Sequence, residues 1–168
     1  MKFVQKTAFI VMLAAAAMAA TSASWSQTGP KPSDNWLLDA PDDTERFHRI
    51  QRMFGGFSSA MVAVAERYDR TYDAVKDENY DLAVYHWKKI REAIELGVLR
   101  RPGREANSVS LFLNGPWQPV MEALNGKDRT KARESFQAAR SACMMCHIAE
   151  KVPFMNDQPL FRRTAAFP

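Results

Sequence analysis

Two cysteines and a histidine lie close together near the C-terminal end of the 168-residue chain, in the order Cys143-Met144-Met145-Cys146-His147. The spacing C-x-x-C-H is the signature of covalent c-type haem attachment. In that chemistry the two thiols add across the haem vinyl groups, and the histidine ligates the iron from the proximal side. Residues three and four apart share one face of a helix, so both sulfurs and the imidazole can meet one macrocycle. The motif therefore predicts one haem c, held by Cys143, Cys146 and His147.

The same three residues also allow other chemistry. The thiols could form a disulfide or a redox pair, or supply half of a zinc site. Structural zinc needs four ligands, and the sequence offers no further Cys and only His48 and His86 as additional histidines. A reactive dithiol is expected at a helix N-terminus, where the helix dipole lowers the thiol pKa. Because this motif closes a helical pattern instead, haem attachment is the favoured interpretation.

The N-terminal residues have the features of an export signal. Lys2 and Lys6 provide a positive start, residues 7–20 are apolar, and small residues then form a cleavage site at the end of residues 1–23. The apolar stretch is shorter than the roughly 20 residues that a membrane-spanning helix needs. We therefore expect a signal peptide over residues 1–23 and a mature chain that does not span a membrane. Haem c is attached outside the bacterial cytoplasm, so we expect a periplasmic protein.

The composition of the mature chain fits one small domain. Removal of the two signal lysines lowers the formal net charge from +4 to +2, which gives no support to nucleic-acid binding. Residues 24–41 are rich in Pro, Ser, Asp and Gln and are interpreted as an extended lead-in. About 145 residues remain after the signal, enough for one domain with its own core.

Helical periodicity begins at Asp42 or Asp43, either of which can cap a helix. From there to Tyr72, apolar side chains recur every three or four residues and fall in one stripe of the helix surface. They are Phe47, Ile50, Phe54, Phe57, Met61, Val64, Tyr68 and Tyr72. The spacing predicts one long helix that faces the core.

Three further helices are predicted, over residues 80–100, over residues 116–124, and from Asp128 into the motif. Asn125-Gly126 provides the stop between the last two. In the final helix the core-facing residues and the motif residues share one stripe. Its members are Ala132, Phe136, Ala139, Cys143, Cys146 and His147.

An antiparallel four-helix bundle over residues 42–150 would bury all four apolar stripes. We therefore expect an all-α fold with a covalent haem c near one end of the bundle. The tail, residues 151–168, carries three prolines and three phenylalanines. It cannot extend the last helix far, and we expect it to lie over the surface, where it could shield a haem edge.

This order of features resembles the class II c-type cytochromes, the cytochrome c-prime-like group. Residues 123–128, Phe136 and the motif are similar to that group's third helix, turn and fourth helix. Gly56-Phe57, residues 79–81 and residues 100–102 are similar to uncharacterised periplasmic monohaem members. The group's common Arg-Gln pair, which meets a haem propionate, has no clear counterpart here. The resemblance implies either a low-spin haem with a Met of the first helix as sixth ligand, or a high-spin haem that binds nitric oxide or carbon monoxide.

We predict Met61 as the sixth iron ligand. It lies near the middle of the first apolar stripe, whereas Met53 falls just outside the stripe and His48 points away from it. Thioether is a known axial ligand of haem c and raises its potential. The alternative is that Met61 only packs the core, with Phe57 or Phe54 over an empty iron position.

These observations predict a single-electron carrier with no enzymatic activity, since no distal acid–base pair is visible. The alternative is a five-coordinate protein that binds NO or CO. The expected partner is a redox protein whose identity the sequence does not give, and a homodimer is compatible with such a bundle. Arg100, Arg101 and Arg104 could meet an acidic partner or a haem propionate, or could form a solvated turn. His86 is expected to be a hydrogen-bonded core histidine that does not bind iron.

Overall fold

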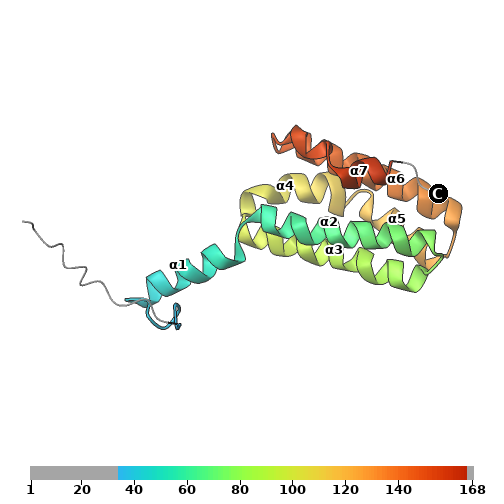
Figure 1. The fold of residues 1–168 in the computed structure, drawn as a ribbon. Helices are drawn as coiled ribbons and strands as arrows, with labels where there is room; N and C mark the ends of the chain where they lie inside the picture. The colour runs from blue at the N-terminus through green and yellow to red at the C-terminus, as the bar shows by residue number, and fades with distance from the viewer. Residues whose placement is uncertain (1–33, 166–168) are drawn as a thin grey trace, which may run out of the picture. The chain divides into compact units, whose positions relative to one another are not determined.

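Helices make up all the regular structure of residues 34–165, the part of the chain that the computed structural model describes (Figure 1). The predicted all-α class is therefore confirmed. The predicted signal peptide, residues 1–23, and most of the predicted lead-in lie outside the described residues. None of the described helices is long and apolar enough to cross a membrane.

The helices belong to one unit that begins at Leu37. In chain order they are α1 (Asp43–Phe54), α2 (Phe57–Lys76), α3 (Tyr80–Arg100), the 3-10 turn η1 (Pro102–Arg104), α4 (Glu105–Ser108), the π-helical turn η2 (Val109–Leu113), α5 (Trp117–Asn125), α6 (Arg129–Ala149), the 3-10 turn η3 (Pro153–Asn156) and α7 (Pro159–Arg163). The predicted second, third and fourth helices correspond to α3, α5 and α6.

The prediction of one continuous helix from Asp43 to Tyr72 was wrong, because the chain breaks at Gly55-Gly56. Gly55 has a φ of 68°, in the left-handed region that favours glycine, and a Cβ there would lie 2.1 Å from Ser59 Oγ. Its N–H donates to the Arg52 carbonyl and ends α1. Gly56 then takes an extended conformation as the N-cap of α2.

The short helix α1 is stabilised by local interactions. The Glu45 carboxylate accepts hydrogen bonds from Arg49 and Arg52 at 3.0 and 2.9 Å, as expected for neighbouring turns of a helix. No residue of α1 is buried, and Phe47 and Phe54 are 66% and 60% exposed. The first half of the predicted apolar stripe therefore does not enter the core, whereas Tyr68 and Tyr72 of α2 do.

Two tight turns join the main helices. After α2, Glu78 takes a positive φ of 56°, and Asn79 N donates to the Ala74 carbonyl at 2.8 Å, which is the pattern of a Schellman motif. Asn79 then caps α3 through its side chain. The turn between α5 and α6 repeats this arrangement with Lys127 at a φ of 51°, so the lysine takes the left-handed conformation and Gly126 does not.

Two tryptophans join α3 to the start of α5 through reciprocal hydrogen bonds. Trp87 Nε1 donates to the Trp117 carbonyl at 2.9 Å, and Trp117 Nε1 donates to the Trp87 carbonyl at 3.3 Å. Arg91 lies 4.0 Å from the centre of the Trp117 ring and donates to the Leu113 carbonyl at the end of η2. The Arg91 hydrogen bond satisfies a backbone carbonyl at the irregular stretch between α4 and α5.

We predict that Gly97→Ala lowers the free energy of unfolding by about 1 kcal/mol or more, because a Cβ at Gly97 would lie 2.8 Å from Ala60 Cβ, where α2 and α3 approach each other. Alanine's better helix propensity, about 1 kcal/mol, would otherwise raise stability. Gly103→Ala is the matched control, since a Cβ there meets nothing within 4 Å. Urea unfolding of the two variants tests this, and a stabilised Gly97→Ala protein would contradict the close approach.

Candidate haem site

The C-x-x-C-H motif occupies the last two turns of α6, a helix that Asp128 caps by accepting a hydrogen bond from Lys131 N at 3.0 Å. Cys143 packs against the hydrophobic core, and Cys146 and His147 are half-buried. Buried residues earlier on the same face fix the rotation of α6; they are Ala132, Phe136, Ala139 and Ala142. The buried face of α6 therefore continues into the motif at Cys143, whereas Cys146 and His147 lie at the edge of that face.

Both thiols are free and favour the protonated form. Burial, with the nearby Cys146 as a second cause, raises the pKa of Cys143 to about 12. Burial also raises the pKa of Cys146, although the Arg104 charge acts in the opposite direction. A redox dithiol requires a lowered pKa at the attacking sulfur, so these surroundings are unlike those of a thioredoxin-type pair.

The surroundings of the motif also offer no zinc site. Within residues 34–165, no group of three or more His, Cys, Asp and Glu side chains is placed to hold a metal ion. The alternative of a structural zinc, which needs four such ligands, therefore gains no support from the described residues.

His147 is held by a residue of the C-terminal tail that the sequence analysis did not find. Its Nδ1 lies 2.8 Å from Asn156 Oδ1, and Asn156 Nδ2 donates to the Met144 carbonyl at 3.1 Å. The Phe161 ring meets the imidazole edge to face, with ring centres 5.7 Å apart. No hydrogen bond to a described residue engages Nε2, so that nitrogen is available to a ligand. The one sequence signal was Pro153, which prevents the last helix from continuing far into the tail.

The tail is anchored on both α2 and α6. Phe161 is buried, and Arg140 of α6 donates two hydrogen bonds to its carbonyl at 3.1 and 2.9 Å. Arg163 pairs with Asp69 and Asp73 of α2, the latter at 2.8 Å. The tail thus bridges the two helices beside the motif.

Aromatic side chains fill the space between α2 and α6. The Tyr68 and Phe136 rings stack with centres 4.4 Å apart, and Phe161 lies 6.4 Å from Tyr68. The Tyr68 hydroxyl is buried near Cys143 and makes no hydrogen bond of normal geometry, although Thr164 lies beside it. Burial raises the pKa of this phenol far above its usual value.

This donor set fits a haem c. Two free thiols and an imidazole with an unengaged Nε2 lie on neighbouring turns of one helix, against an apolar core. Aromatic side chains pack beside Cys143, and the buried Tyr68 hydroxyl next to it makes no hydrogen bond of normal geometry.

Met61 lies on α2, which runs opposite to α6 (Figure 1). Tyr72 is near Phe136, and Tyr68, one turn earlier on α2, is near both Phe136 and Cys143. Met61 precedes Tyr68 by about two helical turns, or about 10 Å. Met61 is partly buried against the core, and its ligation of iron stays a prediction.

No family model, curated protein or solved structure matches this chain. Any functional assignment therefore rests on the residues and geometry described above.

His86 has the surroundings expected of a core histidine. It is buried on α3, and its Nδ1 lies 3.2 Å from Arg67 Nη1. Since a guanidinium only donates, Nδ1 accepts this hydrogen bond. Burial first, and the Arg67 and Arg70 charges next, lower the pKa of His86, while Glu66 raises it slightly.

The three arginines around the turn between α3 and α4 have partners within the fold, and Arg101 donates to the Arg100 carbonyl at 2.7 Å. Arg104 forms an ion pair with Glu150 at the end of α6, and Asn107 donates to the same carboxylate at 2.8 Å. Arg100 donates to the Phe54 carbonyl at 3.2 Å. Arg104 therefore ties η1 to the C-terminal end of α6, and a docking role remains the alternative to a solvated turn.

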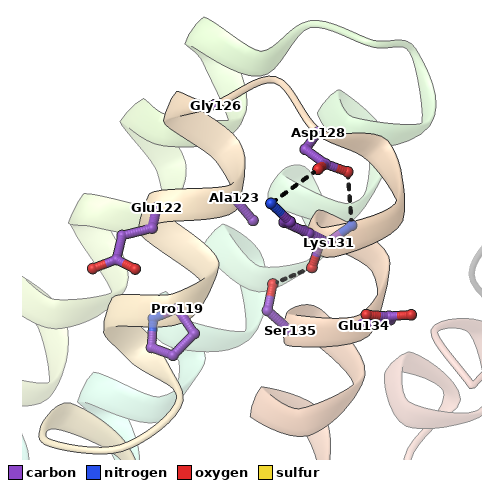
Figure 2. A pocket seen from close by; sticks show the side chains of 8 residues that line it. All are labelled: Pro119, Glu122, Ala123, Gly126, Asp128, Lys131, Glu134 and Ser135. Carbon is purple, nitrogen blue, oxygen red and sulfur yellow. Dashed lines mark hydrogen bonds and ion pairs between the residues drawn. The ribbon is translucent and has the colours of Figure 1, made fainter.

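A surface hollow of about 460 Å³ lies at the turn between α5 and α6 (Figure 2). Several of its polar side chains contact their neighbours: Lys131 lies 3.5 Å from Asp128, and Ser135 donates to the Lys131 carbonyl at 2.7 Å. The hollow faces the first half of α6, whereas the motif occupies its last turns. It adds no reactive group to the candidate site.

We predict that His86 makes the protein less stable as the pH falls from about 7.5 to about 5.5, across the usual pKa of histidine. The folded state lowers the pKa of His86, so the unfolded state binds more protons below pH about 6.5 and is favoured there. Urea unfolding at the two pH values should show a smaller change for His86→Gln than for the wild type. His48→Gln, at an exposed position of α1, should keep the wild-type change. Identical pH dependence in all three proteins would contradict the prediction.

Proposed function

We propose that this protein is an exported, periplasmic c-type cytochrome that carries single electrons, with one haem bound through Cys143 and Cys146 and with His147 as the proximal iron ligand. The observation that carries this proposal is the state of His147. Its Nδ1 is engaged by Asn156, and its Nε2 is left for a metal, next to a partly buried free thiol on the same helix face. Metal-binding histidines typically have this arrangement of one ligating and one hydrogen-bonded nitrogen.

The bound haem would supply a ferric–ferrous couple. The chain's own residues would then bind the haem, orient its axial ligand and exclude water. Cys143 and Cys146 bind the macrocycle, and His147 provides a fixed axial nitrogen. The aromatic rings of Phe136 and Phe161 exclude water from the region between α2 and α6. Fixed ligands in dry surroundings tune the potential through burial and axial ligation, as an electron carrier requires.

The proposed site is similar in its order along the chain to that of class II c-type cytochromes. A periplasmic location follows from the predicted signal over residues 1–23 together with thioether attachment. The physiological partner would be another redox protein, and docking near the end of α6 would bring it closest to the haem.

We predict that the exported chain, made in cells with a working haem-attachment system, gains the mass of one haem that persists after denaturation. Cys143→Ala and Cys146→Ala should each retain at most one thioether, and the double variant should lose covalent haem. Ser141→Ala, at an exposed position of the same helix, should load normally. Intact-protein mass spectrometry makes the measurement, and a wild-type protein without haem mass would reject the proposed function.

We predict that Met61 is the sixth iron ligand. The oxidised protein should show the weak near-infrared band of a Met–iron charge transfer, and Met61→Ala should lose this band and bind carbon monoxide when reduced. Met53→Ala is the matched control, because Met53 lies on α1 and is 70% exposed. A wild-type protein that is already high-spin and binds carbon monoxide readily would exclude Met61 and favour the gas-binding alternative.

A further inference from the structure

The Asn156 side chain is fixed by two hydrogen bonds of different kinds. One joins its amide to His147 Nδ1 at 2.8 Å, and the other joins it to the Met144 carbonyl at 3.1 Å. A backbone carbonyl only accepts, so the amide group that faces Met144 must be the NH₂. The Asn156 oxygen therefore faces His147.

The orientation of the amide fixes the tautomer of the imidazole. An amide oxygen only accepts, so His147 Nδ1 must carry the proton that Asn156 receives. In the neutral ring, Nε2 then has no proton and presents its lone pair. This is the tautomer that a metal ligand bound through Nε2 requires.

The backbone after α6 determines where Asn156 lies. Lys151 takes a φ of 60°, and Val152 N donates to the His147 carbonyl at 2.8 Å, so α6 ends in a Schellman motif one turn after the imidazole. Pro153 then starts η3, which ends at Asn156. On the far side, Phe161 is held by Arg140. The chain on each side of Asn156 is therefore attached to α6, by the Schellman motif before it and by the Arg140 hydrogen bonds after it.

We propose that Asn156 is the positioning residue for the proximal histidine: it fixes the tautomer and the ring orientation of His147 and strengthens Nε2 as an iron ligand. This inference rests on the proposed function. A hydrogen bond accepted from Nδ1–H raises the electron density of the imidazole and stabilises ferric iron over ferrous iron. Asn156 therefore lowers the reduction potential of the bound haem, and the tail is part of the site.

Two substitutions at this position should shift the potential in opposite directions. Asn156→Ala removes the acceptor, so the potential of the haem-loaded protein should rise. Asn156→Asp supplies a charged and stronger acceptor, so the potential should fall below the wild-type value. A residue that only stabilised the tail would give shifts of the same sign in both variants.

Asn125→Ala is the matched control. Asn125 also donates from its amide to a backbone carbonyl near a helix end, that of Met121 at 2.9 Å, and it makes no contact with a histidine. Its loss should leave the potential unchanged. Potentiometric titration of the four haem-loaded proteins, followed by optical spectra, makes the comparison. If Asn156→Ala does not acquire haem, the potential of Asn156→Asp is compared with those of the wild type and Asn125→Ala. A potential below both of these supports the role of Asn156.

The haem content of each preparation is measured first by mass. A wild-type protein without haem would overturn the proposed function and this inference with it. If the wild type carries haem, two results would overturn the role of Asn156 alone. In the first, both Asn156 variants keep the wild-type potential. In the second, both variants shift the potential in the same direction.

Discussion

The packing of Phe136 is the constraint on which the rest of the structure depends. Its ring is buried, stacks on Tyr68 at 4.4 Å, and lies 6.1 Å from the ring centres of both Tyr72 and Trp87. These contacts join α2, α3 and α6 and fix the rotation of α6 about its axis. Because Cys143 lies two turns further along the same face, the core contact also sets the direction of the motif. A rotated α6 would lose its core and its candidate site together.

The core and the candidate site have opposing requirements at Cys143. Packing places its sulfur in an apolar core, and the same burial raises the thiol pKa to about 12, so the folded chain presents a poor nucleophile. Under the proposed function, the thioether bond at this position would therefore have to form before α6 packs.

The C-terminal tail adds two partners to the imidazole of His147, so the candidate site includes residues beyond α6. Asn156 and Phe161 both contact the imidazole, and Arg163 ties the tail to α2. Fixed partners on the imidazole and an apolar lining both reduce the rearrangement that accompanies a change of iron charge, which suits the proposed electron carrier. Under the proposed function, the gas-binding alternative would differ at the sixth iron position, for which Met61 is the predicted ligand.

The sequence by itself determined the all-α class, the bounds of α3, α5 and α6, and the motif, because caps such as Asn79 and Asp128 and the helical period are local signals. It did not reveal the break at Gly55-Gly56, since apolar spacing continues across the break while φ at Gly55 does not. Asn156 was also missed, because no local pattern shows where a tail returns. Only the tertiary structure decided which half of the first apolar stripe is buried and which residue holds His147. Both depend on contacts between segments distant in the chain, and local periodicity carries no information about such contacts.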